Sequence, residues 1–249
     1  MTSSMMAAVL TGVREIEYRP VEVPTMAATE LLVRVAASGI CDSGLAVYRG
    51  THPFKLPPAV LGHEFAGFVE RVGAEVAGFS PRDLVCSAAF ASCEECADCA
   101  RGAANLCTEK RSLSHREWAG SFADHVLLRP TMTHALPPSP HPVVGALAEP
   151  LSIGLHAMGR SGPPVDLSAL VTREITVLGS ALSTRQDFAD VIGWITAGDV
   201  DPAPLVTHHS PLGATAAALR LKERRDVPAG KVMLHVTTDP DEFESGWPA

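Results

Sequence analysis

Apolar and polar positions follow a short period over the first 140 residues of the chain. Brief runs rich in Val, Leu, Phe and Ala are separated by Gly- and Pro-containing turns, a pattern typical of β-strands. Closely spaced strands with turn signals between them favour an antiparallel, barrel-like lobe. The strands predicted in this part are 30–37, 66–72, 83–88 and 122–128.

Beyond residue 140 the apolar positions recur with a helical period. They do so over 142–158, in spite of Pro150, and again over 187–197, where Gly198 supplies a stop signal. Strands therefore dominate the first part of the chain and mix with helices in the second, which predicts an α+β fold that is mainly β. The other elements predicted here are a helix over 213–224 and strands over 175–178 and 231–236.

Composition narrows the function classes. The 249 residues carry a net charge of −8 with a pI near 5.7, which argues against a nucleic-acid or anionic-membrane surface. No run of 18 apolar residues is present, and the start lacks a basic n-region and a proper apolar h-region. We therefore expect a cytoplasmic protein that spans no membrane, with an acidic tail over 239–249.

Four of the six cysteines are grouped in one short segment, C-E-E-C-A-D-C-A-R-G-A-A-N-L-C. Thiolates at Cys93, Cys96, Cys99 and Cys107 can surround one tetrahedral Zn²⁺ and leave no open coordination position, so this site is predicted to be structural. Two disulfides are the alternative, but C-x2-C pairs suit a metal better where no export signal indicates an oxidising compartment. Cys86 lies in an apolar strand and is predicted to be core.

Five motifs in order resemble the zinc-dependent medium-chain alcohol dehydrogenases, most closely their sorbitol and threonine dehydrogenase branch. Besides the four-cysteine segment they are G-I-C-D-S at 39–43, L-G-H-E-F-A-G at 61–67, A-E-P-L at 148–151 and G-K-V-M at 230–233. The resemblance implies a GroES-like barrel for the catalytic domain. It also implies a catalytic zinc held by Cys41, His63 and Glu149, with Glu64 as an alternate ligand, and Ser43 as the hydroxyl that relays a proton. Two zinc ions per chain are therefore expected.

The family's cofactor domain has no counterpart in the sequence. Relatives insert a Rossmann domain after the A-E-P helix, whereas here 16 residues separate that helix from the strand at 175–178, and one βαβ unit takes about 30 residues. No G-x-G-x-x-G occurs. In addition, Asp42 follows the ligand Cys41 where relatives usually carry Gly or His, and its negative charge would repel a pyrophosphate. These features predict that NAD(P) is not bound.

The predicted function follows from a zinc site without a hydride acceptor. Such a site can polarise a carbonyl or hydroxyl group, while a nearby carboxylate moves protons. We expect a redox-neutral lyase or isomerase acting on a small hydroxy-carbonyl substrate, with Glu64, Asp42 or Ser43 moving protons. The resemblance implies that the loops carrying Tyr48, His52 and Trp118 face the metal, which makes these residues candidates for the pocket wall. The alternatives are a dehydrogenase that uses NAD(P) bound elsewhere and a non-catalytic, zinc-stabilised interaction module.

The resemblance also suggests how the chain is organised and assembled. Residues 1–158 would form the first part of the catalytic domain, 159–198 a remnant of the nucleotide-binding domain, and 199–249 a return to the catalytic domain with the acidic tail. In the family the strand equivalent to Ile175 to Leu178 pairs with its copy in a second subunit, and an exposed apolar edge strand invites such pairing. A homodimer is therefore expected.

Overall fold

The computed structural model describes residues 4–115, 118–138, 140–158, 179–224 and 226–236. The predicted strand at 175–178 and the predicted tail at 239–249 lie outside these ranges. All statements below refer to the described residues.

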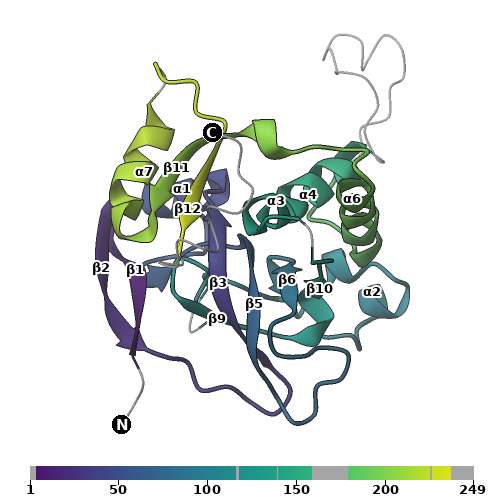
Figure 1. Cartoon of the computed structure of the whole chain (residues 1–249). Coiled ribbons are helices and arrows are strands. Elements are labelled where there is room, and N and C mark those ends of the chain that lie inside the picture. The colour runs from purple at the N-terminus through teal and green to yellow at the C-terminus, as the bar shows by residue number, and fades with distance from the viewer. Residues whose placement is uncertain (1–3, 116–117, 139, 159–178, 225, 237–249) are drawn as a thin grey trace.

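The centre of the molecule is a seven-stranded sheet in which most neighbouring strands are antiparallel (Figure 1). Its strand order is β10-β6-β5-β3-β12-β11, and β9 also pairs with β3. In the order of the sheet the bounds are β10 (Thr133–Ala135), β6 (Leu84–Ser87), β5 (Glu64–Val72), β3 (Leu31–Gly39), β12 (Lys231–His235), β11 (Val206–Pro211) and β9 (His125–Leu128). Because β12 pairs with β3, the end of the described chain returns to the sheet formed by its first half.

Two smaller sheets flank the central one. One has the order β2-β1-β4, with β1 (Ser4–Gly12), β2 (Glu15–Glu22) and β4 (Ala59–Val60). The other pairs β7 (Phe90–Ala91) with β8 (Arg111–Ser112). The sequence pattern did not predict these strands, because β2 is largely exposed and carries polar residues, and β4, β7 and β8 span two residues each.

Helices lie on two sides of the central sheet in Figure 1. Helices α3, α4 and α6 lie together on one side, and α1 and α7 lie near β11 and β12 on the other. The bounds are α1 (Asp42–Tyr48), α2 (Ala97–Ala100), α3 (Pro142–Ala146), α4 (Ala148–Met158), α6 (Arg185–Ala197) and α7 (Thr215–Glu223). The described part of the chain also contains four 3-10 turns: η1 (Ala104–Leu106), η2 (Pro130–Met132), η3 (Ala203–Leu205) and η4 (Leu212–Ala214).

The single helix predicted over 142–158 is in fact two helices. The chain breaks at Leu147, which caps α3, and α4 begins at Ala148. Pro150 therefore lies in the first turn of α4, where its missing N–H has no helical partner to lose. The break turns Glu149 into a first-turn residue of a new helix, and this places its carboxyl group in the interior.

Most strand and helix predictions are confirmed to within a few residues. Helix α6 starts with a capping box between Thr184 and Asp187 and ends at Gly198, whose φ of 78° is the left-handed conformation that glycine adopts freely. The mainly β, α+β fold class is confirmed as well.

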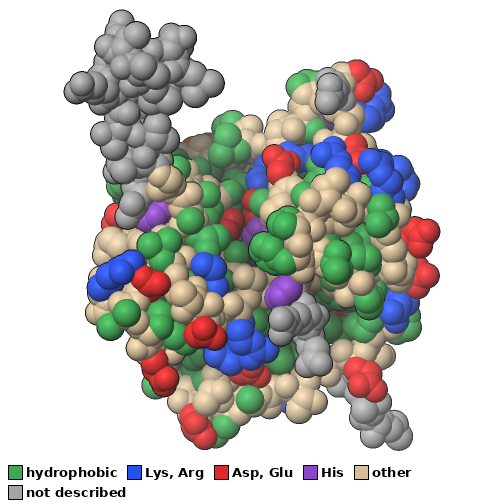
Figure 2. Space-filling view, turned by 180° about the vertical axis from the view of Figure 1, so that it is seen from behind, with side chains coloured by type: hydrophobic (Ala, Val, Ile, Leu, Met, Phe, Trp, Pro, Cys, Tyr) green, Lys and Arg blue, Asp and Glu red, His purple; other side chains and the backbone are tan. Residues whose placement is uncertain are grey.

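The core runs continuously beneath the central sheet and includes Phe65, Val85, Leu128 and Met233, together with Cys86, which is fully buried as predicted. On the face shown in Figure 2, acidic and basic side chains are interspersed rather than gathered by sign. No helix among the described residues is both long and apolar enough to cross a membrane.

Candidate active site

One cavity of about 640 Å³ brings together the residues predicted to hold a catalytic zinc. Its wall includes Cys41, His63, Glu64 and Glu149, together with Ser43 and Asp42. These residues come from three distant parts of the chain: the end of β3 and start of α1, the start of β5, and the first turn of α4. The sequence motifs that seemed separate thus meet at one place in the fold.

Cys41 lies at the turn from β3 into α1 and is the residue that precedes the helix. Burial raises the pKa of its thiol, and the nearby Glu64 carboxylate raises it further. The Ser43 hydroxyl opposes this shift by donating a hydrogen bond to the Cys41 Sγ at 3.2 Å. Because these surroundings favour the protonated thiol, a bound cation would be needed to stabilise the thiolate form of Cys41.

His63 is placed by a tight turn at Gly62. Gly62 has a φ of 97°, and a Cβ at this position would lie 2.5 Å from the Phe122 ring and 2.6 Å from the Ser121 Oγ. Only glycine fits both the left-handed backbone and this close approach. The turn leads directly into β5, so that His63 is 8% exposed.

Glu149 is 4% exposed. Burial raises its pKa to about 8, and the nearby His63 acts in the opposite direction. Imidazole, thiolate and carboxylate are the donor types that bind zinc, and three of them leave one position open. The ligand atoms of Cys41, His63 and Glu149 share the cavity, but they do not all come within 4.8 Å of one another. The donor set therefore fits a zinc ion chemically, although these side chains must draw closer to bind it.

Glu64 has a partner that the sequence analysis missed. The Lys231 ammonium donates hydrogen bonds to both Glu64 carboxylate oxygens, at 2.7 and 2.6 Å, and the Glu64 side chain is 3% exposed. Lys231 lies in the G-K-V-M motif, which served only as a mark of resemblance. The Glu64 carboxylate is therefore already paired with a cation. Asp42, in contrast, has a side chain that is 85% exposed, and its carboxylate lies 3.7 Å from the Lys222 ammonium.

The four clustered cysteines form a separate group of thiols. Their sulfurs all lie within 4.8 Å of one another, and no other group of three or more such donors does so among the described residues. The Cys93–Cys99 distance is 3.9 Å, and the Cys96–Cys99 and Cys93–Cys107 distances are 3.5 Å. Sulfurs bound to a tetrahedral zinc at about 2.3 Å would be about 3.8 Å apart. The four thiols thus have the spacing of a zinc site and, at these distances, no disulfide.

Backbone groups of the same segment stabilise negative charge on these sulfurs. The Cys96 N–H donates to the Cys93 Sγ and the Cys93 N–H to the Cys107 Sγ, both at 3.4 Å. A hydrogen bond from the Cys99 backbone is the largest cause that lowers the pKa of Cys96, to about 6. Such N–H···S contacts favour thiolates, which are the form that binds a metal.

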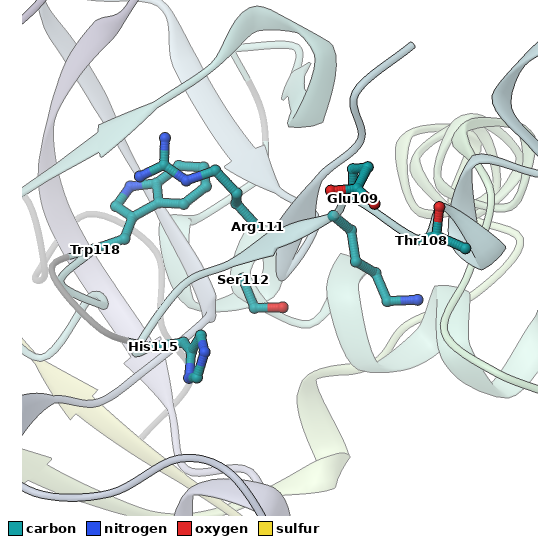
Figure 3. A pocket seen from close by; sticks show the side chains of 7 residues that line it. Thr108, Glu109, Arg111, Ser112, His115 and Trp118 are labelled. Atoms are coloured by element: carbon teal, nitrogen blue, oxygen red, sulfur yellow. The ribbon is translucent and has the colours of Figure 1, made fainter. Parts of the chain in front are cut away.

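Two of the aromatic residues expected near the metal lie elsewhere. Tyr48 is 2% exposed and belongs to the core. Trp118 lines a second cavity of about 540 Å³, where Arg111 lies over its ring at 5.3 Å from the ring centre (Figure 3). His52, in contrast, lines the main cavity as expected.

Comparison with known protein families identifies the family to which a chain with this cavity and this four-cysteine group belongs. The alcohol dehydrogenase GroES-like domain matches residues 27–138, which include Cys41, His63 and the four-cysteine group. The chain belongs to the zinc-dependent medium-chain alcohol dehydrogenase family. It is 33% identical over 175 residues to L-idonate 5-dehydrogenase of Vitis vinifera, covering 67% of this chain and 46% of that protein. It is 34% identical over 162 residues to sorbitol dehydrogenase of Bacillus subtilis, covering 64% and 46%.

Solved structures of alcohol dehydrogenase type share this fold. Galactitol-1-phosphate dehydrogenase from Escherichia coli matches with a TM-score of 0.82 at 19% identity, over 93% of this chain and 100% of that one. Acetophenone reductase from Geotrichum candidum, in complex with NAD, matches with a TM-score of 0.81 at 16% identity, over 95% and 98%. The chain spans about half the length of the curated alcohol dehydrogenase relatives it matches.

These findings correct two expectations. The expected redox-neutral lyase or isomerase activity is wrong, because the relatives are named dehydrogenases. The expectation that NAD(P) is not used is wrong as well, since a structure with this alcohol dehydrogenase fold is in complex with NAD. Both expectations depended on the absence of a G-x-G-x-x-G motif. That absence describes the sequence of this chain and does not determine the reaction.

Proposed function

We propose that the chain forms the zinc- and substrate-binding part of a nicotinamide-dependent dehydrogenase of small polyols. The observation that carries this proposal is the cavity where Cys41, His63 and Glu149 meet beside Ser43. Its relatives named sorbitol and L-idonate dehydrogenase support the polyol class.

Cys41, His63 and Glu149 would hold the catalytic zinc. When bound, zinc supplies Lewis-acid chemistry that polarises a substrate hydroxyl and makes it easier to deprotonate. Ser43, whose hydroxyl lies next to the Cys41 sulfur and whose side chain is exposed, would relay that proton, taking it from the substrate hydroxyl as it passes its own to solvent. Lys231 would keep Glu64 in place and balance its charge, so that the carboxylate does not compete with the substrate for the metal.

The described residues do not form a dinucleotide site. Among them β11 and β12 are the only parallel neighbours in a sheet, whereas a dinucleotide fold needs consecutive parallel strands with a glycine-rich turn into a helix. The residues that bind NAD(P) would therefore lie outside the described ranges. Within the described residues, the chain's own task is to bind the substrate, orient it and move its proton.

The four-cysteine group would hold a second, structural zinc. The spacing of its sulfurs and the backbone N–H groups that point at them support this assignment. Such a closed S4 site folds the segment around it and does no chemistry.

Two measurements test the proposed function together. Elemental analysis is expected to give two zinc ions per chain, and one in Cys41→Ala. The zinc-loaded chain is expected to bind NADH or NADPH in calorimetry. It is also expected to reduce NAD+ or NADP+ with a polyol such as sorbitol as the hydride donor, with loss of turnover in Cys41→Ala and Ser43→Ala. One zinc per chain would indicate the non-catalytic module, and failure to bind either dinucleotide at millimolar concentration would overturn the dehydrogenase assignment.

We also propose that the chain forms a homodimer through Ile175 to Leu178 and acts in the cytoplasm. The support for the dimer is the apolar sequence of this segment, which lies outside the described residues. The support for a reducing compartment is the group of four free thiols spaced for a metal. Light scattering that gives a monomer would refute the dimer.

A further inference from the structure

All four lysines of the chain line one cavity. Lysine accounts for four of the 20 Lys and Arg residues, and these four are Lys55, Lys110, Lys222 and Lys231. They come from four separate segments, yet each is part of the cavity wall that also holds Cys41 and Glu149. None of the described arginines belongs to this wall. A chain with a net charge of −8 thus concentrates one type of cation at its candidate active site.

Two of these lysines already face a carboxylate. Lys231 pairs with Glu64 at 2.6 Å. Lys222 donates to the Gly230 carbonyl at 2.7 Å and lies 3.7 Å from Asp42. Their charges are compensated by neighbours within the cavity wall.

Lys55 has no such compensation. It is half-buried, and its ammonium donates a hydrogen bond of 2.7 Å to the Leu113 carbonyl. No carboxylate within the described part of the chain forms an ion pair with it. Lysine has three N–H donors and a full positive charge, and a partly desolvated ammonium with a single carbonyl partner is costly unless an anion approaches it. The Cys41 thiol is close enough to interact with Lys55 electrostatically, which places this ammonium near the proposed metal ligands.

Lys110 lies at the rim of the cavity, where its side chain is exposed to solvent. Its ammonium donates to the Asn105 carbonyl at 3.1 Å, and it too makes no ion pair within the described residues. Lys110 directly precedes β8, where successive side chains alternate in direction. Figure 3 shows Arg111 turned toward Trp118 and Ser112 turned the other way. Ser112 and Lys110 line both the main cavity and the second one, whereas Arg111 lines only the second.

We propose that Lys55 and Lys110 form a subsite for the negatively charged end of the substrate, a phosphate or carboxylate group carried by the polyol. This inference rests on the proposed function and narrows its substrate class from polyols to acidic polyol derivatives. The hydroxyl to be oxidised would lie at Cys41, His63 and Glu149, while the acidic group at another carbon of the same molecule contacts the two lysines and the Ser112 hydroxyl.

The charges of the cavity favour this assignment. Four lysines face three carboxylates in its wall, and two of those carboxylates, Glu64 and Asp42, lie beside Lys231 and Lys222. The third, Glu149, would be neutralised by the metal. An anion entering the cavity therefore meets two uncompensated ammonium groups and no uncompensated carboxylate. Hydrogen bonds from charged donors are the strong ones.

Calorimetry on the zinc-loaded chain, with no nicotinamide present, tests this subsite. The probes are sorbitol, sorbitol 6-phosphate and gluconate, which are neutral, phosphorylated and carboxylated. We expect one acidic probe to bind about tenfold or more tightly than sorbitol, and the tighter of the two acidic probes identifies the group. The preference should fall to about twofold in Lys55→Met and Lys110→Met, which keep the aliphatic stem, and should weaken as salt increases. Arg71→Gln removes a charge from the exposed end of β5, outside the cavity, and should leave it unchanged.

The outcomes separate this inference from the proposed function. Equal affinity for all three probes, or a preference that survives in the double variant Lys55→Met/Lys110→Met, would overturn the anion subsite. Cys41→Ala is expected to lose turnover while it keeps the preference for the acidic probe, because the lysines are intact. A chain that binds the acidic probe selectively but binds no dinucleotide would refute the dehydrogenase proposal and leave the anion subsite standing.

Discussion

At the scale of single residues, the ion pair between Lys231 and Glu64 is buried beside the proposed zinc ligands. Lys231→Met is expected to lower the free energy of unfolding by about 3 kcal/mol, because it leaves the Glu64 carboxylate in a buried site without its counter-ion. Urea denaturation measures this loss. The double variant Glu64→Gln/Lys231→Met should recover much of it, since no charge is then buried.

Lys222→Met serves as the matched control for that experiment. It removes a lysine from the same cavity, but its neighbour Asp42 is mostly exposed and lies 3.7 Å away. Exposed pairs contribute about 1 kcal/mol or less. A Lys231→Met protein as stable as Lys222→Met would show that the buried pair is not a stabilising element.

At the scale of helices and strands, α4 is tied to the cysteine segment by a short chain of hydrogen bonds. Asn105 is buried, and its side-chain amide reaches His156 of α4 at 3.3 Å and the Ala181 carbonyl at 3.0 Å. The other His156 ring nitrogen lies 3.0 Å from the Asp187 carboxylate of α6. These contacts link the segment that would hold the structural zinc to the helix that carries Glu149.

Asn105→Ala should therefore destabilise the contact between the cysteine segment and helix α4. It removes two hydrogen bonds and leaves the half-buried His156 ring nitrogen and the Ala181 carbonyl without this partner, which costs about 2 kcal/mol. We expect a fall of that size in urea denaturation and a faster release of the structural zinc to a chelator. The neighbouring Leu106→Ala, at a residue that is 40% exposed, should change neither quantity appreciably. Unchanged stability in Asn105→Ala would contradict the link.

The sequence predicted these elements unevenly. Strands β3, β5 and β12 were predicted because both local propensity and burial favour them. The break between α3 and α4 was missed because Pro150 is the only proline in the interior of this segment, whereas the chain turns earlier, at Leu147. The two-residue strand β8 was missed because it has too few residues to show a period, and its pairing with β7 depends on the fold around it.

The same reasoning explains which parts of the site could be predicted. Cys41, His63 and Glu149 were predicted because their motifs resemble those of a family. Lys55 and Lys110 belong to no such motif, and their importance lies in a shared cavity that only the folded chain creates. The cofactor was predicted wrongly because it was inferred from the absence of a G-x-G-x-x-G motif. Residues outside that motif can also bind NAD(P), so its absence says little about the cofactor.

At the scale of the whole molecule, stability should depend on pH through histidines that the fold keeps neutral. His134 of β10 stacks on Phe188 of α6, with ring centres 4.2 Å apart, and is 8% exposed. Burial lowers its pKa to about 4, with a smaller contribution from the nearby Arg185. The pKa of His235 is lowered to about 4 as well, mainly by burial and to a smaller extent by the nearby His209 and His141. Both side chains are therefore uncharged in the folded protein at neutral pH.

The sign of the pH effect follows from the pKa values in the two states. Between about pH 6.5 and pH 4 the unfolded chain binds a proton at His134 that the folded protein does not, so stability falls as the pH falls through this window. The full shift corresponds to about 3 kcal/mol for His134. His134→Phe keeps an aromatic ring against Phe188 and removes the titrating group. Its free energy of unfolding, measured by urea denaturation at pH 7 and pH 4.5, should therefore fall less than that of the wild type, and an equal fall in both proteins would show that His134 is not held neutral by the fold.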